Sequence, residues 1–453
     1  MNNHPGDIVE SKIKDLAFDG KAVGEIDGKI IFLNAGLPGE TVRARITKTK
    51  RNYNVGKVLE VIEKSKERIT AQCSHFDICG GCTWQDLAYE RQLYYKRKQI
   101  YDCLKHIGKF ETVDLAEIVP APNQFHYRNK MEFSFNADPD EDFVFGLHRR
   151  GQFDKIFNLT ECYLTSEKIP EIVNWFREFI KRSGMKAYNV TEHTGFMRFL
   201  MIRQGQNTNQ IMLNIVTVDG DISNLGELIS ETKNRFPEVV TIVQNINNQK
   251  SNISKGEKEI IHYGDGFIEE LILNCRFRIY ANSFFQTNSL QTENLFRTAF
   301  ELLQPKQNDR LLDLYCGAGT IGLTAATMVD EVIGIELEPA AIEAARENAE
   351  LNNIDNAVFY TGLAQELLNK NPEILNGVSA IITDPPRAGM HKKALKALIE
   401  HNHRRLVYIS CNPSTFARDA EILVNSGYNL GKVIPVDMFP HTMHIELVSI
   451  FEK

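Results

Sequence analysis

The sequence lacks the features of a membrane or exported protein. Its 453 residues contain no apolar run long enough to cross a bilayer. Residues 1–7 have neither the basic start nor the apolar stretch of a signal peptide. Hydrophobic residues make up 43% of the chain and charged residues 25%, which is typical of a globular protein. We therefore expect a cytoplasmic protein that does not contact a membrane.

The chain also lacks an overall positive charge. Its formal net charge of -7 argues against a wholly basic nucleic-acid-binding protein, but it leaves room for local basic patches. One patch spans residues 41–57, where six basic side chains and no acidic ones accompany Tyr53. Basic charge beside an aromatic ring suits a nucleic-acid backbone and a stacked base, and a solvated barrel face is the alternative. The six basic residues are Arg43, Arg45, Lys48, Lys50, Arg51 and Lys57.

Cysteines are few, and three of the eight are crowded into ten residues. Cys73, Cys79 and Cys82 have C-x5-C-x2-C spacing, which indicates ligands in a reducing compartment rather than a disulfide framework. A tetrahedral site needs a fourth ligand, for which Cys162 is the choice among the remaining cysteines. Zinc and an iron-sulfur cluster both accept four thiolates, and spacing alone does not separate them. The C-x3-C-x2-C spacing of radical enzymes is absent, which argues against radical chemistry.

A chain of this length predicts two or three domains. Short alternating strands with glycine-rich turns predict an OB-like β-barrel over residues 1–64. Residues 65–270 alternate strands with helices and predict an α+β domain. Residues 271–453 have the pattern of a Rossmann-like doubly wound sheet, closed by a C-terminal strand pair. The expected fold class is therefore multidomain α/β.

Residues 86–106 predict an amphipathic helix. Tyr94 and Tyr101 are expected on its apolar stripe, and Cys103 on its core face. Four basic side chains are expected on its exposed face: Arg91, Lys96, Arg97 and Lys98.

A strand followed by a glycine turn begins the doubly wound part, at residues 310–322. The glycines let the backbone approach a ligand that the helix amides face. The stretch fits G-x-G-x-x-G, so a dinucleotide must be considered. Counted from Asp313 it also fits the D-x-x-x-G-x-G arrangement usual for S-adenosylmethionine. Glu336, after the next strand, offers an acid for ribose hydroxyls with either cofactor.

Two later strand ends favour a methyltransferase. Residues 384–387, Asp-Pro-Pro-Arg, place a carboxylate and a rigid turn over the cofactor, and related sequences mark methyltransferases that act on planar bases. A dehydrogenase has no evident use for this motif. The apolar strand of residues 407–410 then ends at Cys411, followed by Asn-Pro. Ligands bind at this end of strands in open α/β sheets, so Cys411 is expected to face a cleft. Cys275 and Cys316 are assigned to packing.

Together these motifs resemble those of the RNA (uracil-5-)-methyltransferase family, of the type that modifies 23S ribosomal RNA. The resemblance covers nearly the full length and includes His-Thr-Met-His-Ile-Glu at residues 441–446. It implies that the N-terminal barrel is a TRAM domain and that RNA is the partner, with no obligate protein partner evident. It also implies a [4Fe-4S] cluster, structural or RNA-positioning, with four ligands: Cys73, Cys79, Cys82 and Cys162.

The resemblance further implies the reaction. Cys411 would add to C6 of a flipped-out uracil, which activates C5 toward the methyl group, and Glu446 would remove the C5 proton. Ala364-Gln365 departs from the acid that many methyltransferases carry near the adenine, so the adenine contact is unassigned. The residues implied to bind S-adenosylmethionine are Gln286, Tyr315, Glu336 and Asp384.

Other readings remain open from the sequence. The nearest is the same reaction on transfer RNA. A non-catalytic RNA-binding assembly factor would be expected to lack the thiol or the base, but Cys411 and Glu446 are both present. A Rossmann oxidoreductase with a cluster would bind NAD and give Cys411 no role. Cytosine C5-methyltransferases also use a cysteine, so the identity of the target base rests on the resemblance.

Overall fold

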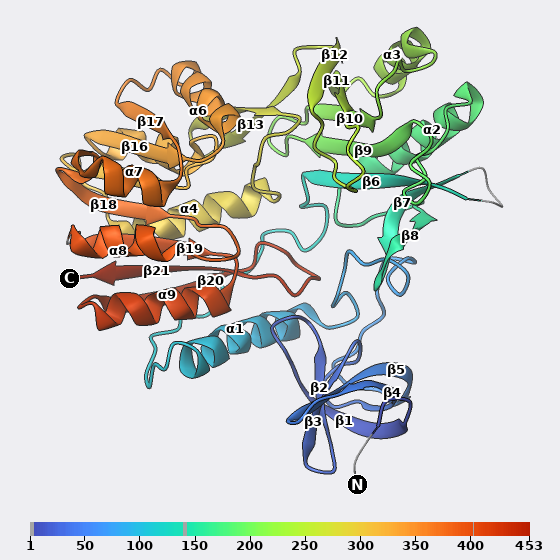
Figure 1. The fold of residues 1–453 in the computed structure, drawn as a ribbon, viewed down its shortest axis with the longest axis horizontal. Coiled ribbons are helices and arrows are strands. Elements are labelled where there is room, and N and C mark those ends of the chain that lie inside the picture. The colour runs from blue at the N-terminus through green and yellow to red at the C-terminus, as the bar shows by residue number, and fades with distance from the viewer. Residues whose placement is uncertain (1–3, 139–142, 402) are drawn as a thin grey trace.

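Three bodies of secondary structure follow one another along the chain: a small barrel, a mixed sheet and a doubly wound sheet (Figure 1). They are seen in a computed structural model that describes residues 4–138, 143–401 and 403–453. None of the helices in this described part is long and apolar enough to span a bilayer.

The N-terminal body is a closed barrel of five strands in the order β1-β2-β3-β5-β4, as the sequence predicted. Burial alternates along β4, where Val42 and Ala44 point into the core while Arg43 and Arg45 face outward. This two-residue period closes a small apolar interior and leaves the basic side chains exposed. The strands are β1 (Ile8–Leu16), β2 (Ala22–Ile26), β3 (Lys29–Leu33), β4 (Thr41–Thr49) and β5 (Tyr53–Glu63).

The middle body is a seven-stranded sheet with the order β12-β11-β10-β9-β6-β7-β8. All neighbours are antiparallel except β10 and β11. Helix α2 packs on the sheet through aromatic rings, with Phe176 against Phe135 and Phe145. The elements are β6 (Lys130–Ala137), β7 (Phe143–Arg149), β8 (Gln152–Asn158), α2 (Lys168–Ser183), β9 (Met197–Gln204), β10 (Ile211–Thr217), α3 (Leu225–Arg235), β11 (Val239–Ile246) and β12 (Lys258–Tyr263), followed by a hairpin of β13 (Phe267–Ile272) and β14 (Cys275–Tyr280).

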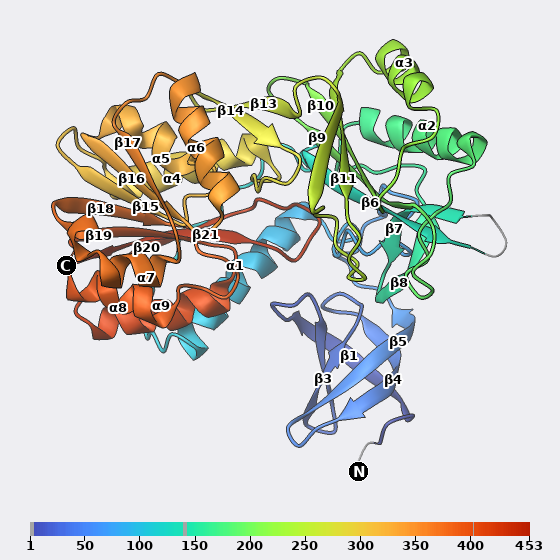
Figure 2. The same ribbon diagram turned by 45° about the horizontal axis from the view of Figure 1, so that its top comes forward.

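The C-terminal body is the predicted doubly wound sheet, with the order β17-β16-β15-β18-β19-β21-β20. Strands β15 to β19 are parallel, and β21 runs antiparallel to both of its neighbours. Helices α4, α5 and α6 cover one face, and α1, α7, α8 and α9 cover the other (Figure 2). Burial on both faces explains why these strands are almost wholly apolar.

The elements of this sheet have the following bounds: α4 (Ser289–Leu303), β15 (Arg310–Leu314), α5 (Thr320–Ala325), β16 (Glu331–Glu336), α6 (Pro339–Leu351), β17 (Ala357–Thr361), α7 (Ala364–Lys370), β18 (Val378–Thr383), α8 (Lys392–Glu400), β19 (Arg405–Ser410), α9 (Pro413–Asn425), β20 (Asn429–Val436) and β21 (Glu446–Glu452).

Helix α1 (Tyr89–His106) lies between the barrel and the C-terminal sheet, where it packs along α9. Its buried face includes Cys103, as expected, but Lys96 is 0% exposed, so its placement on the exposed face was wrong. Tyr94 and Tyr101 are 50% and 40% exposed, so their placement on the core stripe was also wrong. The amphipathic rule assumes one buried face, whereas this helix is covered from two sides and buries polar groups that find partners there.

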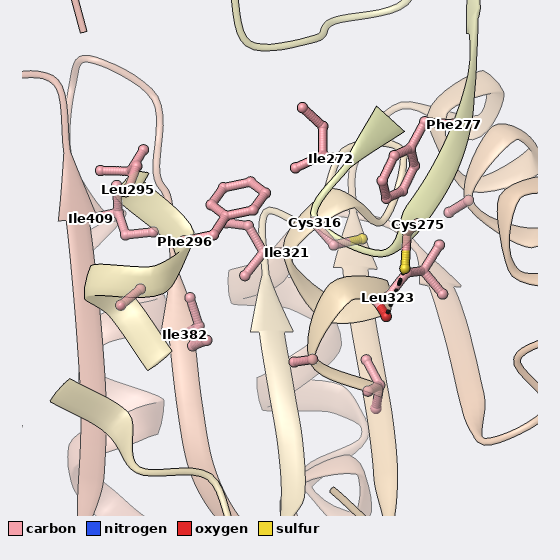
Figure 3. Packing of buried hydrophobic residues seen from close by; sticks show 14 of the residues in the cluster. Ile272, Cys275, Phe277, Leu295, Phe296, Cys316, Ile321, Leu323, Ile382 and Ile409 are labelled. Carbon is pink, nitrogen blue, oxygen red and sulfur yellow. Dashed lines mark hydrogen bonds between the residues drawn. The ribbon is translucent and has the colours of Figure 1, made fainter. Parts of the chain in front are cut away.

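Cys275 and Cys316 are packing residues, as the sequence predicted. Both are buried in the apolar cluster formed with α4 and α5 (Figure 3). The Cys275 Sγ lies 3.6 Å from the carbonyl oxygen of Leu323, its acceptor.

Gly334 in β16 provides a test of this packing. A Cβ added there would lie 2.4 Å from Phe359 Cδ1 and 2.9 Å from Cys316 Sγ. We expect Gly334→Ala to lower the free energy of unfolding by about 1–3 kcal/mol because the core is overpacked. The matched control is Gly226→Ala in α3, where an added Cβ meets no atom within 4 Å. Urea unfolding should show a lower midpoint for Gly334→Ala only, and equal midpoints for both variants would contradict the packing.

Candidate active site

Five side chains named by the sequence analysis gather at one edge of the C-terminal sheet. Tyr315, Glu336, Asp384 and Cys411 each lie at or directly after the carboxyl end of a parallel strand, β15, β16, β18 or β19. Glu446 begins β21, and because β21 is antiparallel to β19 its start lies beside the end of β19. Ligands bind at this edge of open α/β sheets.

The glycine turn after β15 is shaped for a ligand. Tyr315 has a φ of 67°, in the left-handed region that side chains rarely adopt, and Gly317 has a φ of 55°. The carboxylate of Glu336 accepts a hydrogen bond from the Gly317 amide at 3.2 Å. Asp313 accepts from the Gly322 amide at 2.8 Å, while its other oxygen has no hydrogen-bond partner among the described residues. Burial raises the pKa of Asp313 to about 7.

Gln286 and Asp384 are in direct contact. The Gln286 Nε2 donates to Asp384 Oδ2 at 3.2 Å. Burial raises the pKa of Asp384 to about 6, against the opposing effect of this hydrogen bond. The loop that carries Gln286 is fastened to the middle body, because the Asn129 side chain donates to the Gln286 carbonyl at 2.9 Å and buried Arg203 donates to the Ser283 carbonyl.

Sequence reasoning missed Asn129 and Arg203 as supports of this loop. No local pattern marks the contact of Asn129 with Gln286, which is 157 residues away along the chain.

Cys411 stands between β19 and α9. The next residue, Asn412, caps α9 by accepting from the amides of Ser414 at 3.0 Å and Thr415 at 3.5 Å, and Pro413 takes the first helical position. The Asn-Pro pair therefore starts a helix as well as ending the strand.

Cys411 and Glu446 share a buried site. Glu446 is 4% exposed and its Oε2 has no hydrogen-bond partner in the described part of the chain. Burial, and secondarily the charge of Asp384, hold the pKa of Glu446 well above its usual range. Burial, together with the charges of Glu446 and Asp384, raises the pKa of the Cys411 thiol to about 12. The site thus holds a half-buried thiol beside two carboxyl groups that bind protons readily.

The positive charge of Arg387 opposes the raised pKa values of Cys411 and Glu446. Arg387 is exposed, and its guanidinium lowers the pKa of both Cys411 and Glu446 against the larger effect of burial. The sequence analysis saw Arg387 only as part of a motif and gave it no role.

The four cysteines singled out by the sequence line one pocket. Cys73, Cys79 and Cys82 meet Cys162 there. The Gly81 amide donates to Cys79 Sγ at 3.3 Å, and the Gln85 side chain donates to Cys82 Sγ at 3.6 Å. Within residues 4–138, 143–401 and 403–453, no three His, Cys, Asp or Glu side chains are arranged to hold a single metal ion. In the described part of the chain the four thiols therefore share a pocket, but no metal site is shown.

Arg150 fixes the cysteine segment to the turn between β7 and β8. Its Nη2 donates to the carbonyls of Phe76 at 3.1 Å and Cys82 at 2.5 Å. This guanidinium is partly buried by the segment that it holds.

The basic patch of the barrel is largely exposed. Arg43 is paired with Glu10 and Glu60, so its charge is compensated. Tyr53 is 37% exposed and meets Phe32 edge-on, with ring centroids 5.4 Å apart. The other five basic side chains of the patch are exposed: Arg45, Lys48, Lys50, Arg51 and Lys57.

Comparison with known proteins identifies a methyltransferase family and a barrel domain in this chain. The model of the tRNA (uracil-5-)-methyltransferase family matches residues 88–453, and that of the TRAM domain matches residues 4–59. An RNA methyltransferase of Chlorobaculum tepidum is 38% identical over 99% of this chain and 97% of its own length. One of Listeria innocua is 38% identical over 98% of this chain and 97% of its own.

A solved structure is also similar over nearly the whole chain. It is the Pyrococcus abyssi tRNA (uracil-54, C5)-methyltransferase in complex with S-adenosyl-L-homocysteine, with 32% identity and a TM-score of 0.78. The similarity covers 98% of this chain and 100% of that one. The chain therefore belongs to the tRNA (uracil-5-)-methyltransferase family and carries a TRAM domain before its methyltransferase sheet.

Proposed function

We propose that this protein transfers a methyl group from S-adenosylmethionine to C5 of a uridine in 23S ribosomal RNA. The observation that carries the reaction is the placement of Cys411 and Glu446 together in one buried site, with Asp384 beside them. Uracil C5 is a poor nucleophile, so methylation there needs a thiol that first adds to the ring and a base that later removes a proton.

S-adenosylmethionine, when bound, supplies the methyl group on a sulfonium. The residues at the strand ends fit it. A Cβ added at Gly317 would meet no atom within 4 Å, so the space over the glycine turn is open. Glu336 lies at the end of the second strand of the unit, where a carboxylate accepts ribose hydroxyls in such folds. Gln286, Tyr315 and Asp384 complete the proposed binding set.

The chain's own residues account for each proton and bond. Cys411 gives its proton to water and adds to C6 as the thiolate, which makes C5 an enolate carbon. C5 then forms a bond to the methyl carbon as the bond between that carbon and the sulfonium sulfur breaks. Glu446 then takes the remaining C5 proton, the bond from sulfur to C6 breaks, and the thiolate leaves. A raised pKa makes the Glu446 carboxylate a stronger proton acceptor, while Arg387 favours the thiolate form of Cys411. The target base must leave its stack to reach this buried site.

Ribosomal RNA is proposed because the chain combines the TRAM barrel with the four-cysteine pocket, the combination on which its resemblance to the ribosomal type rests. Transfer RNA is the second candidate. It is favoured by the family's description and by the similarity to the Pyrococcus abyssi enzyme, which acts on uracil 54 of transfer RNA.

We further propose that Cys73, Cys79, Cys82 and Cys162 hold a [4Fe-4S] cluster. Four thiolates are the usual ligand set of such a cluster, and the support here is that thiols from two distant segments line one pocket. The methyl transfer includes no oxidation or reduction step, so the cluster would stabilise the fold or position RNA.

Methylation of separate ribosomal and transfer RNA substrates tests the function. Protein purified without oxygen and supplied with labelled S-adenosylmethionine should form 5-methyluridine in large-subunit RNA. Cys411→Ala should abolish the label because ring addition needs the thiol, while the packing variant Cys275→Ala should keep it. Label found only in transfer RNA would contradict ribosomal RNA as the substrate. No label in either RNA, from protein that binds the cofactor, would favour a non-catalytic assembly factor.

The raised pKa of Cys411 predicts a pH dependence. Below a pKa of about 12 the thiolate fraction grows about tenfold per pH unit. Alkylation of Cys411 by iodoacetamide, followed by peptide mass spectrometry, should therefore rise steadily between about pH 7 and pH 9, where an ordinary thiol begins to level off. A plateau below pH 8 would show that the thiol is already ionised there.

The cluster is tested by metal content. Cys82→Ser should lose bound iron and acid-labile sulfide together with the visible charge-transfer absorption. Cys103→Ser, a thiol of α1 outside the pocket, should retain all three. Iron and sulfide missing from the anaerobic wild-type protein would contradict the assignment, and stoichiometric zinc would replace it.

A further inference from the structure

The loop that leads into Glu446 is held by side chains from outside the C-terminal sheet. This base loop, residues 437–445, joins β20 to β21. Its Phe439 carbonyl accepts from Lys96 Nζ at 3.0 Å, and its Pro440 carbonyl accepts from the Tyr127 hydroxyl at 3.0 Å. The backbone of the base loop is therefore set by residues more than three hundred positions earlier in the chain.

A buried ion pair fixes the start of the base loop. Lys96 Nζ lies 2.6 Å from Asp437 Oδ1, and both side chains are 0% exposed. The Tyr89 hydroxyl donates to Asp437 Oδ2 at 2.9 Å, and the Phe439 amide donates to Asp437 Oδ1 at 3.3 Å. The single ammonium of Lys96 thus contacts the loop at a carboxylate and at a carbonyl two residues further on. Burying two charges is costly and is weak evidence for a stabilising role, which favours a role in geometry.

The middle of the base loop is clamped by a second polar contact. Gln92, one helical turn before Lys96, accepts from the His441 amide at 2.8 Å, and its Nε2 lies 3.1 Å from His441 Nδ1. The ring of Phe125 stacks on His441 at a centroid distance of 4.3 Å. Two successive turns of α1 therefore contact the two ends of the segment 437–441, Lys96 at Asp437 and Gln92 at His441.

The base loop also touches the barrel and the cysteine segment. The His441 carbonyl accepts from the amides of Thr83 and Trp84, which directly follow Cys82. Met443 packs against the barrel core, and a Cβ added at Gly20 would lie only 2.9 Å from its Sδ. The barrel and the cysteine segment therefore both contact the base loop.

We propose that Lys96 is a positioning residue for the reaction: through Asp437 and the Phe439 carbonyl it holds the base loop so that the Glu446 carboxylate meets the C5 proton. The inference rests on the proposed role of Glu446 as base. Removal of the C5 proton is the step in which this carboxylate acts. In the proposed reaction, cofactor binding uses side chains at the ends of other strands and in the loop of Gln286, and ring addition uses Cys411, directly after β19.

Loss of the Lys96 contact should therefore slow removal of the C5 proton, while cofactor binding and ring addition stay as in wild type. With Lys96→Met, we expect the covalent complex of enzyme and methylated RNA to persist about 10–100-fold longer, because a shift of about 1 Å in a reacting group has effects of this size. The affinity for S-adenosylmethionine should stay as in wild type. Single-turnover reactions stopped in denaturant and resolved on denaturing gels measure the lifetime of the complex, and equilibrium binding of labelled cofactor measures the affinity.

Two further variants separate positioning from stability. Lys105→Met, an exposed lysine of the same helix, should release RNA at the wild-type rate. Lys96→Met combined with Asp437→Leu removes both buried charges, so it should recover stability lost by the single variant. It also lacks the ammonium contact to Phe439, so the long-lived complex should remain.

Release at the wild-type rate by the folded Lys96→Met protein, or by the double variant, would overturn the positioning role. The wild-type reaction, run alongside, distinguishes failure of the positioning role from failure of the proposed function. If wild-type protein forms no 5-methyluridine in either RNA, the proposed function fails and the inference fails with it.

Discussion

The burial of Cys411, Asp384 and Glu446 in one site is the constraint on which the rest of the structure depends. Burial raises the pKa of all three groups. Nearby negative charge adds to this for Cys411, from Glu446 and Asp384, and for Glu446, from Asp384. The site gains a strong proton acceptor but holds its thiol largely protonated at rest. Arg387 is the nearby positive charge that acts against this. In the proposed reaction, the same burial excludes water from a reactive sulfur and an electrophilic methyl donor.

The surrounding architecture serves to bring these groups together. Parallel strands β15 to β19 bring Asp384 and Cys411 to one edge, and the reversal of β21 adds Glu446 to it. Contacts from outside the sheet then set the two loops that matter most. Asn129 holds the loop of Gln286, and Lys96 holds the loop before Glu446. The barrel, the cysteine segment and the C-terminal sheet therefore meet at the loop before Glu446.

Local patterns were enough to predict part of this arrangement. The strand, glycine turn and Asp-Pro-Pro motifs place Tyr315, Glu336 and Asp384 at strand ends, because each motif directly follows an apolar run. The barrel was predicted from short alternating strands with glycine-rich turns, and the doubly wound sheet and its closing strand pair from the strand pattern of residues 271–453. All three are confirmed. The domain limits at residues 64 and 270, and the roles of the site residues, stay predictions.

What the sequence could not show depends on partners distant in the chain. Lys96 reads as an exposed lysine in a helix until Asp437, 341 residues away, is folded against it. Nothing in the local sequence around Arg150 indicates that its guanidinium binds the carbonyls of Phe76 and Cys82, which are 74 and 68 residues away. Helix α1 lies in the predicted middle part of the chain but packs on the C-terminal sheet. Each case is a long-range contact that overrides the local pattern.

The most direct test of the account is to trap the enzyme on RNA that contains 5-fluorouridine. Fluorine at C5 cannot be removed as a proton, so the ring should stay bonded to the thiol after methyl transfer. With S-adenosylmethionine present, mass spectrometry should find a methylated fluorouridine on the peptide that contains Cys411. A complex that dissociates in denaturant, or a nucleotide attached to any other residue, would contradict the central claim that Cys411 is the nucleophile.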